Sequence, residues 1–414
     1  MMLLYRIFGL VIYGVVYPYG RIRAALGDEA WRGRLAVNGC CKAADIWLHA
    51  ASVGEVRVIS YLVDYLQKKR PAIRMHVTVM TRAGYSTAKT LLGDKAAISF
   101  LPLDVAFLQH RAVSSIQPQL LVIAETEIWP HLIQAASAKN APIILVNARM
   151  TDRALGRYLR FKRLFALLLS RYDRIFAKSE DDCARFLRLG AVPDRCETTG
   201  DMKFDAPLLE RGDKKRQQIR ESLGVGDNEC LLVAGSTREG EEEQLFAVYR
   251  SVRAADSRVR LVIAPRHLTR LAEVEQIAQS QGLRVHRHSA PADSSPQDIV
   301  LVDRMGLLND LYLAADVAFV GGTLVDIGGH NVLEPVWAGT PVLFGLSVGN
   351  VREAAEYILE NKYGAQAATA AQLETIIRKY LQKEISFRVK TDDDITHSPT
   401  ACAGDYILRK LDRA

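Results

Sequence analysis

The sequence has 414 residues, of which 49% are hydrophobic and 24% are charged, and this composition is typical of a globular protein. A chain of this length is too long for a single hydrophobic core, so we expect two domains. The formal net charge of +7 favours an anionic substrate or an anionic membrane surface. The sequence has no aromatic-interleaved basic stripe, zinc-finger spacing or RNA-binding signature, so we expect no nucleic-acid partner.

The cysteines and histidines predict neither a disulfide framework nor a metal site. The six cysteines are scattered without a C-x-x-C pair, which is the pattern of reduced thiols. The histidines are dispersed, and the acidic run at residues 392–394 is typical of a solvated turn. Because a P-loop and a clear G-x-G-x-x-G motif are also absent, we expect no metal and no cofactor.

The first 20 residues form an apolar segment that we interpret as a membrane anchor. Residues 1–19 are interrupted only by Arg6 and two glycines, and their tyrosines suit a membrane interface. Arginines follow the segment, which predicts that the body of the protein stays in the cytoplasm. No small-x-small cleavage site follows the segment, which disfavours a cleaved signal peptide. Two interpretations remain open, namely a spanning signal anchor and a helix lying in the interface.

Apolar β-like runs alternate with helical patterns along the rest of the chain. In the first half we expect strands at residues 46–50, 75–80, 120–124, 143–146 and 174–178. In the second half we expect strands at residues 231–234, 261–264, 299–302, 317–320 and 341–344. Short, continuous, β-branched runs of this kind are typical of buried parallel strands, and the alternation predicts doubly wound sheets. We therefore expect Rossmann-like domains at residues 21–208 and 209–414, facing a cleft, with the last helix free to pack back on the first domain.

Several polar motifs follow strands of the first half. Ser52-x-x-Glu55 matches a helix capping box, and it also places a carboxylate at a helix start, where the dipole would keep Glu55 ionised and able to act as a base. Glu125 and Glu127 end another strand, where a buried acid is costly unless it is paired or functional. Lys203 lies near the domain junction and is either an anion ligand or a surface lysine.

The second half carries three motifs suited to an anion. Gly235-Ser236-Thr237 predicts a helix start that forms an anion nest. Arg266 follows a strand and offers a planar fork for a phosphate or a carboxylate, or a salt bridge to a nearby helix. Two glycine pairs at residues 321–329 strip side chains from a loop, and a helix near Asn331 would then present its N–H groups to a ligand. The alternative is an ordinary strand-to-helix loop.

These motifs together resemble the bacterial transferases of 3-deoxy-D-manno-octulosonic acid (Kdo). The matching segments are residues 49–56, 125–130, 147–153, 200–205, 235–242, 265–267 and 321–335. The resemblance spans most of the chain and implies a GT-B glycosyltransferase of lipopolysaccharide biosynthesis at the cytoplasmic side of the cell inner membrane. It also implies Kdo transfer from CMP-Kdo to a lipid A precursor of the lipid IVA type.

The resemblance carries roles to individual residues. Glu55 corresponds to the general base, and Glu125 and Lys203 correspond to positions that support the transition state. The substrate-binding positions are Gly54, Ser236, Pro265, Arg266, Met305, Gly306, Leu307, Asn331, Val332, Leu333 and Glu334. This chain departs from the family pattern at Leu307, where an acidic residue is usual, and at Arg238, where a histidine is common. We expect a single displacement with inversion that needs no metal.

Two rival functions remain at this stage. One is another membrane-associated GT-B enzyme that uses a UDP-sugar. The other is a non-catalytic polyanion-binding membrane protein, which would explain the charge and the anchor but not the carboxylates at strand ends.

Overall fold

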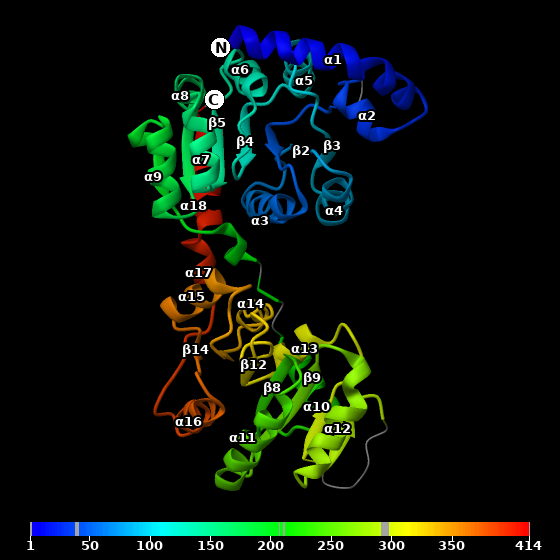
Figure 1. Cartoon of the computed structure of the whole chain (residues 1–414), viewed down its shortest axis with the longest axis vertical. Coiled ribbons are helices and arrows are strands. Elements are labelled where there is room, and N and C mark those ends of the chain that lie inside the picture. Colours follow the sequence, from blue (N-terminus) through cyan, green and yellow to red (C-terminus); the bar gives the residue numbers. More distant parts are fainter. Residues whose placement is uncertain (1, 38–40, 207, 210–211, 291–297, 414) are drawn as a thin grey trace. The chain divides into compact units, whose positions relative to one another are not determined.

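The computed structural model describes residues 2–37, 41–206, 208–209, 212–290 and 298–413, and it divides into two compact units (Figure 1). Unit 1 comprises residues 1–206 and 393–414, and unit 2 comprises residues 207–392. The expected boundary after residue 208 lies two residues beyond the observed one. The segment expected as a separate anchor belongs to unit 1, and one of the six cysteines, Cys40, lies outside the described residues.

Unit 1 alternates strands and helices around one sheet. Its elements are α1 (Met2–Ala25), α2 (Glu29–Arg34), β1 (Ile46–His49), α3 (Val53–Lys69), β2 (Met75–Val79), α4 (Arg82–Leu92), β3 (Ala97–Phe100), α5 (Ala106–Ile116), β4 (Leu120–Ala124), α6 (Pro130–Ser137), β5 (Ile143–Ala148), α7 (Asp152–Leu159), α8 (Lys162–Leu169), β6 (Tyr172–Ala177), α9 (Glu180–Leu189), β7 (Cys196–Thr198), the short 3-10 helices η1 (Pro193–Arg195) and η2 (Met202–Asp205), α17 (Asp392–Thr396) and α18 (Pro399–Leu411). The seven strands are all parallel, in the order β3-β2-β1-β4-β5-β6-β7.

The central strands of unit 1 are buried on both faces, which explains their continuous apolar runs. Ile46 and Leu48 of β1 pack in one core with α3, α4 and α18. Trp47 between them packs in the other core with α5 and α6, because successive side chains of a strand point to opposite faces. Figure 1 shows α3 and α4 on one side of this sheet and α5 and α6 on the other. The C-terminal α18 lies on α3, where Tyr65 donates to Asp405 Oδ1 at 2.7 Å.

Unit 2 repeats this architecture. Its elements are α10 (Asp213–Ser222), β8 (Cys230–Thr237), α11 (Glu242–Ala255), β9 (Val259–Pro265), η3 (Leu268–Arg270), α12 (Leu271–Ser280), β10 (Val285–Arg287), β11 (Ile299–Leu301), α13 (Leu308–Ala314), β12 (Val317–Val320), α14 (Leu333–Trp337), β13 (Val342–Phe344), α15 (Arg352–Glu360), β14 (Gly364–Gln366) and α16 (Ala370–Leu381). The seven parallel strands have the order β10-β11-β9-β8-β12-β13-β14. Helices α11, α12 and α16 share a core over one face.

Both sheets have a topological switch point. At this point the connections after two neighbouring strands run in opposite directions along the sheet. In unit 1 this point lies between β1 and β4, and in unit 2 between β8 and β12. Open parallel sheets bind ligands at the carboxyl ends of strands near such a point. Four of the motifs expected to carry function follow these four strands, and the others follow β5, β7, β9 and β11.

Helix α1 lies along unit 1 and is not an isolated anchor. The hydroxyl of Tyr5 donates to Asp104 at 2.8 Å, and Tyr13 contacts Phe107 edge-on at 5.0 Å between ring centroids. Farther along the helix, a Cβ on Gly20 would lie 2.5 Å from the ring of Trp31, so helix and ring are in close contact. Across the described part of the chain, no helix is both long and apolar enough to cross a membrane, and the spanning interpretation therefore finds no support.

Candidate functional site

Glu55 follows β1 at the switch point of unit 1 and forms the expected capping box. Its Oε1 accepts from the hydroxyl of Ser52 and its Oε2 from the backbone N–H of Ala51, both at 2.8 Å. The Ser52 hydroxyl in turn accepts from the Glu55 N–H. The capping box therefore orients the carboxylate and leaves it 6% exposed at the helix start.

Burial makes Glu55 a weak acid. Desolvation raises its pKa to about 7, and the nearby carboxylates of Glu127 and Glu125 add to this rise. The expectation that the helix dipole keeps Glu55 ionised is wrong in sign, because the cost of desolvating the charge exceeds the stabilisation from the helix start. A carboxylate with a pKa near 7 is poised to take a proton at neutral pH.

Glu125 follows β4, on the other side of the switch point, and pairs with two cations. Its Oε2 lies 2.9 Å from Arg149 Nε and its Oε1 lies 3.5 Å from Lys203 Nζ. Its backbone has φ +55°, which is uncommon for a residue with a side chain and aims the carboxylate away from the strand. The carboxylate is almost fully buried while both cations are about half exposed.

Lys203 is held by residues to which the sequence analysis gave no individual role. Asn147 is the next-to-last residue of β5 and has φ +50°, and its Oδ1 accepts from the Met202 N–H. Asp201 accepts from the Lys203 N–H and lies 3.1 Å from the ammonium of Lys178. Lys178 lies immediately beyond β6 and Asp201 lies three residues beyond β7, which was the available signal. We call Glu55, Glu125, Arg149 and Lys203 the unit 1 site.

Two further positions border this site. Burial raises the pKa of Glu127, and the indole of Trp129 partly offsets the rise. Gly54 is exposed in the first turn of α3, and a methyl group there would have only the Ser52 hydroxyl, at 3.9 Å, among the described residues within 4 Å. Among the described residues, packing therefore does not require a glycine at this position.

In unit 2 the double-glycine loop holds a side chain of the protein itself. Glu241 is fully buried, and its carboxylate accepts from the backbone N–H groups of Arg238, Gly322, Thr323 and Leu324 at 2.7 to 3.0 Å. A Cβ on Gly321 would lie 2.4 Å from the Ser236 carbonyl oxygen. The expectation that these glycines leave room for a ligand is thus wrong for Gly321 and for the Gly322 N–H, which Glu241 occupies.

The helix expected near Asn331 begins two residues later and is short. Helix α14 has five residues, so its dipole is too small to bind an anion on its own. Asn331 accepts from the Leu333 N–H, and its amide donates to Glu334 Oε1 at 3.2 Å. The side chains of Val332 and Leu333 are buried, which leaves only their backbone for a ligand. Helix α11 likewise begins at Glu242, because β8 continues through Thr237.

A small cavity of about 60 Å³ lies at the carboxyl ends of β8, β9 and β11. Six of the expected substrate-binding residues line it, namely Ser236, Pro265, Arg266, Met305, Gly306 and Leu307. Ser236 has φ +56° at a bulge in β8, which turns its side chain out of the strand pattern. The structure therefore brings these separate segments together at one edge of the sheet.

Arg238 bridges two histidines beside this cavity. Its Nε donates to His330 Nε2 at 2.9 Å, and its Nη1 lies 2.6 Å from His267 Nε2. Burial, followed by the charges of Arg238 and Arg266, lowers the pKa of His330 to about 4, so this ring is neutral and accepts through Nε2. Glu334 has a raised pKa from burial, which Asn331 and Arg266 partly offset. We call Ser236, Arg238, Arg266, His330 and Glu334 the unit 2 site; of these, His330 had not been assigned a role.

Comparisons with known proteins agree with this arrangement. Residues 29–206 match the family model of 3-deoxy-D-manno-octulosonic-acid transferase (kdotransferase). The 3-deoxy-D-manno-octulosonic acid transferase of Chlamydophila psittaci is 33% identical over 345 residues, which cover 83% of this chain and 78% of that protein. A bifunctional glycosyltransferase/methyltransferase of Fusobacterium nucleatum is 37% identical over 327 residues, or 78% of this chain, but the chain spans only 50% of that protein.

The fold of this chain is also found in a solved structure of low sequence identity. The UDP-GlcNAc 2-epimerase of Neisseria meningitidis superposes with a TM-score of 0.52 over 89% of this chain and all of that chain, at 13% sequence identity. Together with the two parallel-sheet, Rossmann-like units of this chain, the likeness supports a GT-B-like architecture. The chain is therefore a glycosyltransferase, and it belongs to the 3-deoxy-D-manno-octulosonic acid transferases, which act in lipopolysaccharide biosynthesis.

Proposed function

We propose that this enzyme transfers Kdo from CMP-Kdo to a lipid A precursor of the lipid IVA type, by a metal-independent displacement that inverts the anomeric carbon. The observation that carries the proposal is Glu55, a buried carboxylate with a pKa near 7 at the switch point of unit 1. Family membership supplies the sugar, and the residues of the two sites suggest how each substrate is handled.

Glu55 serves as the general base. Its carboxylate accepts the proton of the acceptor hydroxyl while that oxygen forms a bond to the anomeric carbon of Kdo. The bond from this carbon to the phosphate oxygen breaks, and its electron pair leaves with CMP. The two hydrogen bonds from Ala51 and Ser52 hold the carboxylate in one orientation for this transfer.

Glu125 and Lys203 support the transition state. Departure of CMP leaves positive character at the anomeric carbon, which a buried carboxylate stabilises. The carboxylate of Kdo in turn needs a cation, and Lys203 is held beside Glu125 with a half-exposed ammonium group. Arg149 fixes the other oxygen of Glu125.

The unit 2 site binds the donor nucleotide. Arg266 and Arg238 supply cations for the phosphate, and Glu334 with Asn331 supplies acceptors for ribose hydroxyls. Ser236, Pro265, and residues 305–307 form the small cavity beside them. Because the cations already neutralise a phosphate, the proposal requires no metal.

A UDP-sugar is the rival donor, and a direct comparison separates the two. We expect CMP to raise the melting temperature of the full chain more than UDP does at equal concentration. Selective stabilisation by UDP would overturn the donor assignment.

We also propose that α1 lies in the interface of the inner membrane at its cytoplasmic side. Its exposed apolar residues Ile7, Val11, Val15 and Ile22 recur at helical spacing, and Leu26 just beyond its end continues the pattern, with Val15 76% and Leu26 77% exposed. Tyr5 and Tyr13 hold its opposite face to unit 1. The exposed Arg21 and Arg32 favour anionic lipid headgroups.

Flotation with anionic vesicles tests the placement of α1. The wild-type chain should float, and the double variant Val11→Glu/Val15→Glu should stay at the bottom of the gradient with an unchanged melting temperature. The control variant Ser280→Glu/Lys383→Glu, which places two glutamates at exposed positions of unit 2, should still float. Equal flotation of all three chains would show that α1 does not contact the lipid.

Product analysis tests the reaction itself. Incubation with CMP-Kdo and a lipid A precursor should yield a product whose mass rises by one or more Kdo units, with and without EDTA. Loss of activity in EDTA that one metal restores would refute the metal-free mechanism, and transfer to another acceptor only would refute the lipid assignment.

A further inference from the structure

A second, larger cavity of about 300 Å³ lies in unit 2, at the opposite end of the strands from the unit 2 site. Its lining includes Asp316 and Pro341, which immediately precede β12 and β13, so it lies at the amino ends of these strands. The unit 2 site lies at the carboxyl ends. The volume is at the lower end of the range for small-molecule pockets in proteins.

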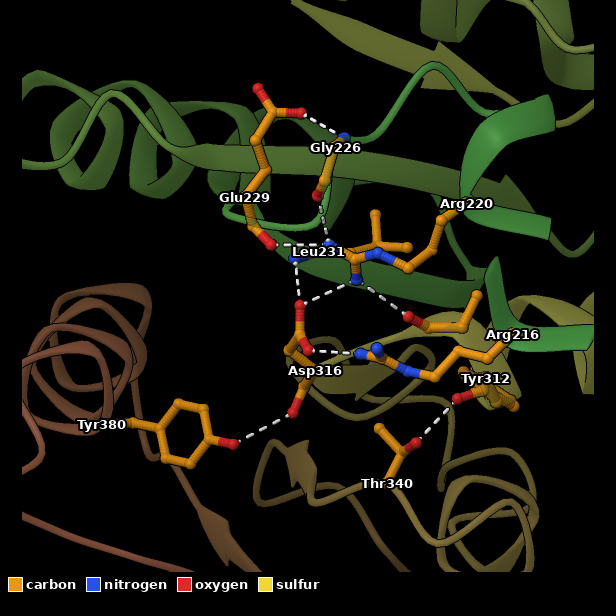
Figure 2. A network of polar contacts seen from close by, with 10 residues as sticks. Arg216, Arg220, Gly226, Glu229, Leu231, Tyr312, Asp316, Thr340 and Tyr380 are labelled. Carbon is orange, nitrogen blue, oxygen red and sulfur yellow. Dashed lines mark hydrogen bonds and ion pairs between the residues drawn. The ribbon is translucent and has the colours of Figure 1, made fainter. Parts of the chain in front are cut away.

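The floor of this cavity is a network of polar contacts around the partly exposed Asp316, in which Arg220 is buried (Figure 2). The carboxylate of Asp316 accepts from Arg216 at 2.6 Å, from Arg220 at 3.0 Å and from the Leu231 N–H at 2.7 Å. Its backbone carbonyl accepts from the hydroxyl of Tyr380 at 3.1 Å. Two guanidinium groups thus contact the one carboxylate, so these three side chains together carry a net positive charge.

The walls combine apolar surface with a cation. Tyr380 and Phe387 stack on each other at 5.6 Å between centroids, and Leu313 and Val389 add aliphatic surface. Lys215 lines the cavity in the first turn of α10, where none of the described side chains caps the helix. Its ammonium pairs with Asp310 at the surface, and Asp213 is the remaining acid of the lining. These groups suit a flat apolar body with an anionic head.

Two helices connect this cavity to the unit 2 site. Helix α13 begins next to Leu307, which lines the small cavity, and Leu313 near its other end lines the large one. Helix α14 likewise carries Glu334 in its first turn, and Gly339 just beyond its end lines the large cavity. The Thr340 hydroxyl donates to the Tyr312 carbonyl and ties the two helix ends together (Figure 2).

We propose that the large cavity binds a small organic anion with a flat apolar body, and that its occupation changes the affinity of the unit 2 site for the donor nucleotide. A ligand wedged between Leu313, Gly339 and the aromatic pair displaces the ends of α13 and α14. Because both helices are short and closely packed, the displacement reaches their other ends. The second clause rests on the donor assignment proposed above.

Direct binding of a probe to the full chain tests the cavity. We expect naphthoate to bind in a saturable manner by titration calorimetry, and naphthylmethanol, which has no charge, to bind at least 10-fold more weakly. Val389→Trp fills the cavity and should abolish naphthoate binding, and Lys215→Ala should weaken it about 10-fold. Lys214→Ala alters the exposed neighbour, which does not line the cavity, and should bind as the wild type does.

Naphthoate binding that survives Val389→Trp, or no binding by the wild type, would overturn the site. Equal binding of naphthylmethanol, or no effect of Lys215→Ala, would overturn the anionic class. Lys215 is half exposed, so its variant separates a lost ligand contact from a folding defect.

The coupling has two readouts. Saturating naphthoate should change the Kd of CMP about 5-fold or more, and CMP should change the Kd of naphthoate by the same factor. Naphthoate alone, without CMP, should also slow the amide hydrogen exchange of residues 308–314 and 333–337. Unchanged exchange with unchanged CMP affinity would overturn the coupling. If CMP alone does not bind, the donor assignment fails, and hydrogen exchange still decides whether the two ends of the helices communicate.

Discussion

The two switch points of this enzyme use buried glutamates in opposite ways. Glu55 of unit 1 accepts two hydrogen bonds, has carboxylates for neighbours and has a pKa raised to about 7. Glu241 of unit 2 accepts four backbone hydrogen bonds and holds the double-glycine loop in place. We therefore propose that Glu55 accepts a proton and that Glu241 has a structural role, and that the number of donors around each carboxylate distinguishes the two.

The largest expected effect is on activity when Glu55 is changed. Glu55→Gln keeps the shape of the side chain and one of its two acceptor oxygens but removes the base, so kcat/KM for Kdo transfer should fall about 1000-fold. Steady-state assays with CMP-Kdo measure this. A loss smaller than about 10-fold in a folded variant would assign Glu55 to capping only.

Stability measurements at pH 8 control for the fold. The folded-state pKa of Glu55 is raised above its ordinary value, so its burial costs no stability below the ordinary pKa. The cost grows as pH rises from that value to about 7 and stays constant at higher pH. Glu55→Gln should therefore be at least as stable as the wild type at pH 8. A clear drop in its melting temperature at pH 8 would contradict the raised pKa.

The next effect in size is on stability when Glu241 is changed. Glu241→Ala leaves four N–H groups, two of them in fully buried hydrogen bonds, without their acceptor, which should lower the free energy of unfolding by about 3 kcal/mol. Chemical denaturation measures this. The matched variant Glu239→Ala alters an exposed neighbour and should change it by less than about 0.5 kcal/mol. Equal effects of both variants would mean that the loop does not depend on Glu241.

Arg238 should have an intermediate effect, on nucleotide affinity. Arg238→Ala removes the cation that bridges His267 and His330 and should weaken CMP binding about 30-fold, as loss of a charge-assisted hydrogen bond does. Because Arg238 also depresses the pKa of His330, that pKa should rise above about 4 in the variant, which histidine NMR measures. CMP affinity unchanged by the substitution would place the phosphate elsewhere.

The smallest expected effect concerns Gly54. Gly54→Ala adds a methyl group to an exposed position of the first turn of α3, so helix propensity should raise the melting temperature slightly. If a substrate approaches the backbone there, KM for the acceptor should rise about 5-fold. A more stable chain with unaltered kinetics would show that Gly54 does not contact the substrate.

The sequence predicted the central strands well and missed the edges. All the buried runs that we expected as strands are strands, and β4 and β12 begin and end where expected. The four strands that were not expected, β3, β7, β10 and β14, are the outermost strands of the two sheets. Each is half exposed and three or four residues long, so no continuous apolar run marks it.

The site was predictable where chemistry follows a strand end and unpredictable where it depends on a distant partner. Glu55 and Glu125 were identified from their positions after buried strands. The role of Glu241 was not, because it depends on N–H groups about 80 residues away in sequence. The bridge from Arg238 to His330 spans 92 residues and was missed for the same reason.

The pH dependence of Kdo transfer tests the central claim most directly. If Glu55 is the base, kcat/KM of the wild type should rise with pH and level off above an apparent pKa near 7, because only the ionised carboxylate accepts the proton. The residual activity of Glu55→Gln should lack this rise. A wild-type profile that is flat between about pH 5.5 and 8.5, or the same rise in Glu55→Gln, would contradict the account.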